Sequence, residues 1–309
     1  MKTYLHLPLL ALVAAAGPAL ASEPAIDIYG FVDAAVGKET GQTGTHLLDD
    51  AGSRLGFKGE QAVGNGLTAS FQIEARFTPQ TGEASTPFWK GGAYAALGGD
   101  FGKVLLGRWW SQAFLKAQFA ADPFGEETVG LNYGTVGCGG AGGCVGAFWV
   151  DKSASYEFSA NGFSFGAQVA EKPTGGKSPY NAGASYANGG LYVGLGYEKP
   201  GVADASWSSA TLNYDFGAVK LISGYGTGKD ALGSTRRNMI VGFNAPVGQG
   251  NVIGAFDVHR DGGVTVTSKL ALGYQYHLNK NAKLFATVAN DSKAPSSKTG
   301  YDVGMLYSW

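Results

Sequence analysis

The sequence has 309 residues, of which 50 are glycine, well above the ~7% of an average protein. Its formal net charge is −1 and no basic cluster stands out, so nucleic acid is excluded as a predicted partner. Three histidines follow residue 21, and the zinc-protease motif His-Glu-x-x-His does not occur, so we predict no enzyme, no metal site and no cofactor.

The first 21 residues have the layout of a secretory signal peptide. Lys2 supplies a positive charge, residues 7–20 are mostly Leu, Ala and Val, and Ala19-Leu20-Ala21 matches a small-x-small cleavage site. We predict cleavage after Ala21, which leaves residues 22–309 as the mature chain. The alternative, an N-terminal membrane anchor, requires ~20 apolar residues, and this run is shorter.

From residue 25 onward, apolar and polar residues alternate in segment after segment. In residues 67–77 one face carries Leu, Ala, Phe, Ile, Ala and Phe, and the other carries Thr, Ser, Gln, Glu and Arg. Such alternation predicts strands with one apolar and one polar face. Sixteen segments show it: 25–36, 53–61, 67–78, 90–98, 103–110, 153–159, 163–171, 181–188, 191–199, 207–216, 218–227, 236–245, 251–260, 264–277, 282–290 and 299–309.

The connections between these segments alternate between short and long. Seven are tight and rich in Gly and Asn, such as residues 63–66, and these residues suit hairpin turns because they accept positive φ. The other eight include the long segments 37–52, 79–89 and 111–152. An open antiparallel sheet would leave exposed edges, and in lipid every backbone group must be paired.

We therefore predict an all-β fold, a 16-stranded antiparallel transmembrane β-barrel with short periplasmic turns and long outer loops. A soluble β-sandwich or propeller is the alternative, but it explains neither the signal peptide nor one continuous chain of hairpins, and no blade repeat occurs.

Cys138 and Cys144 enclose only glycine and alanine. An exported chain meets an oxidising compartment, so a local disulfide is predicted. A metal site would need more ligands than these two thiols, and no histidine lies nearby. The closed loop is short, so the bond would mainly stiffen this segment.

Five motifs in the first part of the chain are distinctive: Ile28-Tyr-Gly-Phe-Val-Asp-Ala34, Gly52-Ser-Arg-Leu-Gly-Phe-Lys-Gly-Glu60, Gly64-Asn-Gly-Leu67, Phe71-Gln-Ile-Glu74 and Asp100-Phe-Gly-Lys-Val-Leu-Leu-Gly-Arg108. They resemble motifs of the general trimeric porins of Gram-negative bacteria, especially the β-proteobacterial branch. The resemblance covers the mature chain in layout, and its motifs are most specific in residues 26–110 and at the C-terminus.

The resemblance implies a passive diffusion channel for ions and small hydrophilic solutes across the outer membrane, weakly charge-selective. It also implies a homotrimer, with residues 79–89 reaching a neighbouring subunit, surrounded by outer-membrane lipid and lipopolysaccharide. A substrate-specific channel for a sugar or an organic acid is the alternative. For residues 79–89, a mobile surface loop is the other interpretation.

The last segment ends on an apolar face that comprises Tyr301, Val303, Met305, Tyr307 and Trp309. In the resembled family, the terminal strand is the signal read by the barrel assembly machinery, which makes that machinery an expected partner. Trp309 also fits an interfacial anchor, because indole prefers the headgroup level of a membrane.

A barrel of this size is wide enough to hold an aqueous channel. Strand parity places Arg54, Lys58 and Arg76 on the lumen face, because their neighbours of opposite parity are apolar. For Arg108, strand parity predicts a side chain on the outer face of the barrel, whereas the resemblance implies a side chain that faces the lumen.

The resemblance also implies that the third long loop, residues 111–152, folds into the pore. It would bring Asp122, Glu126 and Glu127 opposite the basic residues and form a charged constriction. A solvated outer loop for these acids, and ordinary salt bridges for the arginines, are the alternatives. Ser155 stands where family members often carry arginine, which weakens the expectation of strong anion selectivity, although Lys152 could compensate.

Overall fold

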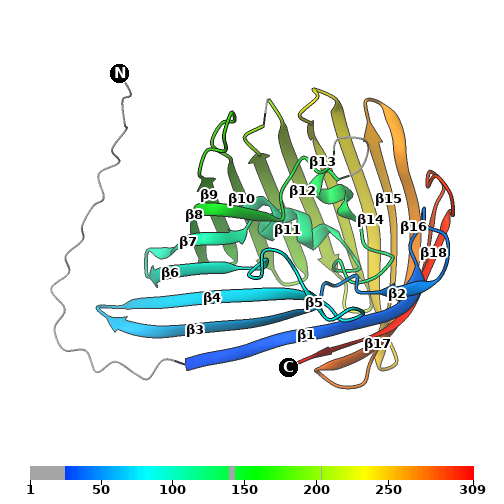
Figure 1. The fold of residues 1–309 in the computed structure, drawn as a ribbon, viewed down its shortest axis with the longest axis horizontal. Helices are drawn as coiled ribbons and strands as arrows, with labels where there is room; N and C mark the ends of the chain where they lie inside the picture. Colours follow the sequence, from blue (N-terminus) through cyan, green and yellow to red (C-terminus); the bar gives the residue numbers. More distant parts are fainter. Residues whose placement is uncertain (1–24, 139–142, 203) are drawn as a thin grey trace.

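The computed structural model describes residues 25–138, 143–202 and 204–309 (Figure 1). The predicted signal peptide, residues 1–21, lies outside the described residues. Sixteen long strands are present: β1 (Ala25–Lys38), β3 (Arg54–Gly64), β4 (Leu67–Thr78), β6 (Ala93–Gly99), β7 (Gly102–Trp110), β8 (Trp149–Ala160), β9 (Phe163–Ala170), β10 (Tyr180–Asn188), β11 (Leu191–Lys199), β12 (Ser206–Asp215), β13 (Lys220–Lys229), β14 (Thr235–Val247), β15 (Gly250–Asp261), β16 (Val264–His277), β17 (Ala282–Asp291) and β18 (Thr299–Ser308). Each corresponds to one predicted segment.

Two short strands, β2 (His46–Leu48) and β5 (Glu83–Ala84), lie in the loops after β1 and β4. They extend existing ladders, since β2 pairs with β1 and β5 pairs with β4. They therefore add no further strand to the circumference of the barrel.

The sheet closes on itself because the first and last strands pair. Antiparallel pairing of β1 with β18 runs from Phe31 opposite Ser308 to Lys38 opposite Tyr301. All other long strands pair with their neighbours in sequence, and Figure 1 shows the C-terminus lying against β1. Closure leaves no unpaired sheet edge between them, and the predicted 16-stranded antiparallel barrel is confirmed. Within the described chain, no helix has the length and apolarity needed to cross a membrane.

The outer surface of the barrel is apolar. Along β18, Tyr301, Val303, Met305 and Tyr307 are exposed, whereas Asp302, between the first two, is buried. Aromatic residues gather near both ends of the strands, which is the girdle pattern of a barrel in a lipid bilayer. Contacting pairs are Phe163–Tyr186, Tyr214–Phe216 and Tyr307–Trp309 near the short turns and Tyr180–Tyr197 near the long loops.

The third long connection folds into the barrel, as Figure 1 shows for the green segments between β7 and β8. It contains a π-helical turn, η1 (Phe114–Gln118), and two 3₁₀ turns, η2 (Phe119–Ala121) and η3 (Tyr133–Val136). Because β8 begins at Trp149 rather than at residue 153, this inner loop comprises residues 111–148, four fewer than the predicted 111–152.

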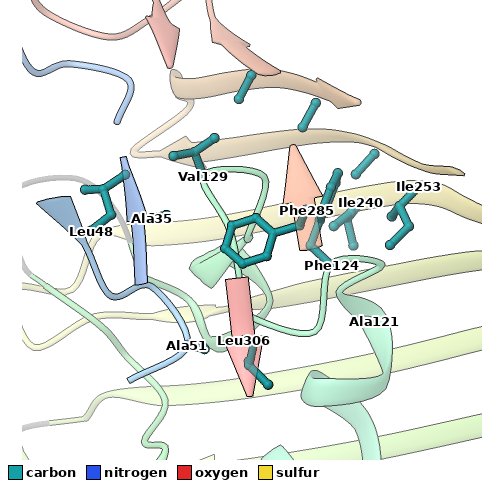
Figure 2. Close-up of a cluster of buried hydrophobic side chains, with 13 residues drawn as sticks. Ala35, Leu48, Ala51, Ala121, Phe124, Val129, Ile240, Ile253, Phe285 and Leu306 are labelled. Atoms are coloured by element: carbon teal, nitrogen blue, oxygen red, sulfur yellow. The ribbon is translucent and has the colours of Figure 1, made fainter. Parts of the chain in front are cut away.

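Apolar packing holds the far end of the inner loop against the barrel wall. Phe124 and Val129 of the loop are buried in one cluster with wall residues such as Ile253, Phe285 and Leu306 (Figure 2). Burying a side chain of this size contributes ~1.5–3 kcal/mol. This part of the lumen is therefore filled by protein.

Candidate functional site

A row of glycines on the inner wall lets the inner loop approach the backbone of β10 and β11. A Cβ atom on Gly183 would lie 2.2 Å from the carbonyl oxygen of Gln112, and one on Gly194 would lie 2.1 Å from that of Lys116. Both distances are shorter than any real Cβ contact. Glycine is thus required at these positions for the observed docking of η1.

Polar side chains of the wall complete this docking. Carbonyl groups at the end of a helical turn have no partner within the turn. Here three side chains donate to them: the Tyr192 hydroxyl to Lys116 O (2.8 Å), the Thr211 hydroxyl to Ala117 O (2.6 Å) and the Asn213 amide to Ala120 O (2.7 Å). The path of the loop is consequently fixed by the inner faces of β11 and β12.

Glu198 fastens both ends of the inner loop to β11. Its buried carboxylate accepts hydrogen bonds from the Ser111 hydroxyl (2.9 Å), the Gln118 amide and the backbone N–H of Ala147 (3.1 Å). Sequence parity did not single out this residue, because its partners lie far away along the chain.

Asp122 organises the tip of the loop. It accepts hydrogen bonds from the backbone N–H groups of Phe124 (3.2 Å), Glu126 (2.9 Å) and Asn132 (3.4 Å). Burial raises the pKa of its carboxyl group, and these hydrogen bonds oppose that effect. Asp122 therefore lies within the loop, with its hydrogen bonds directed to loop atoms and not to the wall arginines.

Arg54 and Arg76 lie side by side on adjacent strands, directly opposite one another in the β3–β4 register. Like charges opposite each other on a sheet repel, so each needs nearby acceptors. Arg54 donates to Ala51 O (2.7 Å), and Arg76 donates to Gly52 O (3.1 Å) and forms an ion pair with Glu74 (2.8 Å).

A cavity of about 510 Å³ separates this guanidinium pair from the tip of the inner loop. Arg54 and Arg76 line it from the wall, and Glu126 and Glu127 line it from the loop. Burial, together with the charge of Asp122, raises the pKa of Glu126 to about 8, and the two arginines act in the opposite direction. Basic and acidic groups thus face the same opening.

The charge of Glu127 is balanced by a lysine of β17, three strands away from β3 around the barrel. Its carboxylate forms an ion pair with Lys283 of β17 and accepts a hydrogen bond from Gln275 of β16 (3.5 Å). A second cavity of about 530 Å³ continues toward the short turns, and it shares Leu115, Phe119, Gly125 and Glu127 with the first. The two cavities therefore adjoin at these four residues.

The other two predicted basic residues lie elsewhere. At Gly107, where φ is 139°, the β7 ladder shifts register, and a bulge of this kind re-aims the following side chain. Arg108 donates to Lys90 O (2.9 Å) and forms an ion pair with Asp151, and it does not line the cavity of Arg54. Lys58 is exposed and lies 3.9 Å from Asp27, close to the short turns.

Aromatic side chains line much of the same cavity, a feature that strand parity did not predict. Trp110 stacks on Trp149 (centroids 3.6 Å apart) and on Phe114 (4.9 Å). Phe119 and Tyr133 expose 47% and 41% of their surface within the lining. The available sequence signal was the Trp-Trp and Phe-Trp pairs that flank the inner loop on either side.

The predicted disulfide joins Cys138 and Cys144. Residues 139–142 between them lie outside the described residues. Fully buried Arg236 of β14 holds the flanking backbone, because its guanidinium donates to Gly137 O (3.2 Å) and Gly143 O. Asp230 (3.2 Å) and Asp261 (3.5 Å) balance the charge of this arginine.

Comparison with known proteins places these features in a family context. A family model described as Gram-negative porin matches residues 9–294. The chain is 27% identical to outer membrane porin protein 32 of Delftia acidovorans, over 97% of this chain and 92% of that protein.

Two solved structures share the fold over most of both chains. The anion-selective porin from Comamonas acidovorans has a TM-score of 0.70 at 21% identity and covers 93% of this chain and 100% of that one. The trimer form of OmpT from Vibrio cholerae has a TM-score of 0.71 at 15% identity, with the same coverage of both chains.

Proposed function

The chain belongs to the Gram-negative porin family, and from this premise we propose that ions cross its barrel between Arg54 and Arg76 on the wall and Glu126 and Glu127 on the inner loop. It is a passive channel of the outer membrane. The observation that carries the proposal is that the guanidinium pair and the two loop acids line one cavity. Opposed charges of this kind set ion preference by their net sign.

The net charge of the groups that line the cavity favours anions weakly. Glu127 is paired with Lys283 and Arg76 with Glu74, and Glu126 has a raised pKa, so Arg54, which has no ion-pair partner in the described part of the chain, outweighs the acid that faces it. The anion-selective title of the Comamonas structure agrees with this sign. Ser155, where family members often carry arginine, is buried and supplies no charge, which supports weak selectivity. Arg108 and Lys58 contribute at the two entrances, outside the constriction.

Liposome swelling tests diffusion of uncharged solutes. For proteoliposomes containing the refolded protein, we expect swelling rates that fall smoothly as sugars grow from pentoses to trisaccharides, because a water-filled path discriminates by size. Rates should rise linearly with sugar concentration. Saturation with one sugar, together with exclusion of others of equal size, would instead favour the substrate-specific channel.

Ion preference should depend on pH through two carboxyl groups of the cavity. Burial raises the pKa of Glu126 to about 8 and that of Asp50 to about 7. As pH falls from 9 to 6 both groups take up protons and lose negative charge, so the cavity becomes more positive. We expect the KCl reversal potential to move toward anion preference over this interval. Glu126→Gln should remove most of the change, and a shift in the opposite direction would contradict the assignment.

We also propose that the protein is a homotrimer exported through a cleaved signal peptide. The trimer form of OmpT shares the fold, and Phe88 and Trp89, 54% and 39% exposed on the loop after β4, offer apolar surface to a neighbouring subunit. Chemical cross-linking in native outer membranes should stop at three chains, and the purified protein should begin at Ser22.

The last strand is proposed as the segment read by the barrel assembly machinery. Trp309 donates its backbone N–H to Gly30 O (3.2 Å), so the final residue also helps to close the barrel. Deleting Trp309 should reduce the amount of protein in the outer membrane severalfold. Trp309→Phe is the matched control and should retain most of it. Equal amounts of the deletion variant and the wild type would show that this residue is no assembly signal.

A further inference from the structure

The constriction combines a guanidinium pair with an aromatic wall in one cavity of about 510 Å³. A constriction that selects inorganic ions by their charge requires the guanidinium pair but not the aromatic wall. The cavity lies within the ~300–1,000 Å³ range of small-molecule sites, which typically have mostly apolar walls and a few polar groups. The aromatic lining residues are Phe31, Trp110, Phe114, Phe119, Tyr133, Phe148 and Trp149.

The rings form a continuous contact network instead of lying apart. Trp110 stacks between Trp149 and Phe114. Phe148 contacts both Phe114 (5.1 Å) and Tyr133 (5.5 Å), each at a steep angle. These contacts fix the rings in place, so the surface that faces the lumen is pre-organised for a flat apolar ligand.

The guanidinium groups join the edge of this network. Arg54 lies 4.3 Å from the ring centroid of Phe31, and Arg76 lies 5.7 Å from that of Trp149. Arg54 has no carboxylate within ion-pair distance among the described residues, and Nη2 of Arg76 is buried without a hydrogen-bond partner. One guanidinium therefore lacks a counter-ion, and the other keeps a free donor.

We propose that this cavity binds planar aromatic carboxylates during permeation, a proposal that rests on the proposed channel function. The carboxylate accepts hydrogen bonds from Arg54 and Arg76, since guanidinium groups match carboxylate geometry. The ring lies against the aromatic wall beside Phe119 and Tyr133. Aliphatic carboxylates of the same size have only the first of these two interactions.

Current block in single channels tests this assignment. Benzoate added to a KCl solution should lower the mean current and increase its noise at a concentration about threefold to tenfold below that required for cyclohexanecarboxylate, because the latter lacks a π face. Phe119→Leu keeps an apolar side chain but removes a ring, and it should reduce this ratio. Phe163→Leu, on the outer face where Phe163 is 64% exposed, is the matched control and should leave the ratio unchanged.

Three outcomes would separate the possible failures. Equal block by benzoate and cyclohexanecarboxylate would overturn recognition of the ring. Stronger block by benzylamine than by benzoate would overturn the assignment of the carboxylate to the arginines, since the loop acids would then be the recognising groups. Absence of any KCl current from folded protein would overturn the channel assignment itself.

Discussion

Replacing Arg54 and Arg76 together with glutamine is expected to shift the KCl reversal potential clearly toward cations. Each guanidinium lines the cavity that we propose as the ion path. At an effective dielectric constant between those of protein and water, one charge about 6 Å from a permeating ion contributes on the order of 1 kcal/mol, or about fivefold in relative permeability. Glutamine removes the charge and keeps a polar but shorter side chain, so the substitution does not narrow the path.

The effect should depend on salt, because the Debye length falls from ~10 Å at 0.1 M to ~3 Å at 1 M. Selectivity differences between wild type and variant should therefore be larger in dilute KCl. Arg237→Gln provides the control, since Arg237 is exposed and shares strand parity with the outward-facing Met239. An unchanged reversal potential in the double variant would show that ions do not pass this pair.

Adding a methyl group to each of two wall glycines, Gly183→Ala and Gly194→Ala, is expected to displace the inner loop. The new Cβ atoms would lie 2.2 Å and 2.1 Å from the backbone oxygens of Gln112 and Lys116, so the loop must retreat by about 1 Å to reach ordinary contact. Overpacking of this kind costs ~1–3 kcal/mol per site. Because the loop would move toward Arg54 and Arg76, we expect a smaller single-channel conductance and a lower thermal unfolding temperature.

Gly98→Ala is the matched control for this pair. A Cβ atom there would meet its nearest heavy atom at 3.6 Å, an ordinary van der Waals distance, and its φ is not positive. This variant should conduct and unfold like the wild type. If the double variant also does so, the close docking of η1 on β10 and β11 does not set the width of the path.

The barrel itself was predictable because its causes are local. Alternation with period 2 gives each strand its two faces, and Gly- and Asn-rich pairs mark the hairpins, as at Asn65 and Asn161, which adopt positive φ. These signals repeat often enough that closure follows from the strand count. The start of β8 at Trp149 was missed because residues 149–152 do not show the alternation cleanly.

The site was less predictable, because its geometry depends on contacts between distant segments. Parity places Arg54 and Arg76 together, but the bulge at Gly107 that re-aims Arg108 leaves no parity signal. The carboxylate of Asp122 accepts hydrogen bonds from backbone N–H groups of the inner loop, whereas Glu126 lines the cavity beside Arg54 and Arg76. These two roles depend on how residues 122–132 fold, and residue type does not distinguish them.

Ion-pair and hydrogen-bond partners on distant strands could not be predicted from the sequence either. Glu127 meets Lys283, and Glu198 meets both ends of the inner loop, across separations that periodicity does not encode. The aromatic wall leaves no strand-period signal for a related reason, because most of its members come from the inner loop and from the strand ends that flank it.

Single-channel recording of the refolded wild-type protein in a planar bilayer under a KCl gradient tests most directly whether ions pass between the guanidinium pair and the inner loop. At pH 6 we predict stepwise conductance with a modest anion preference, since Glu126 is then largely protonated. Folded protein that gives no conductance steps, or a cation preference at this pH, would contradict an ion path past Arg54 and Arg76.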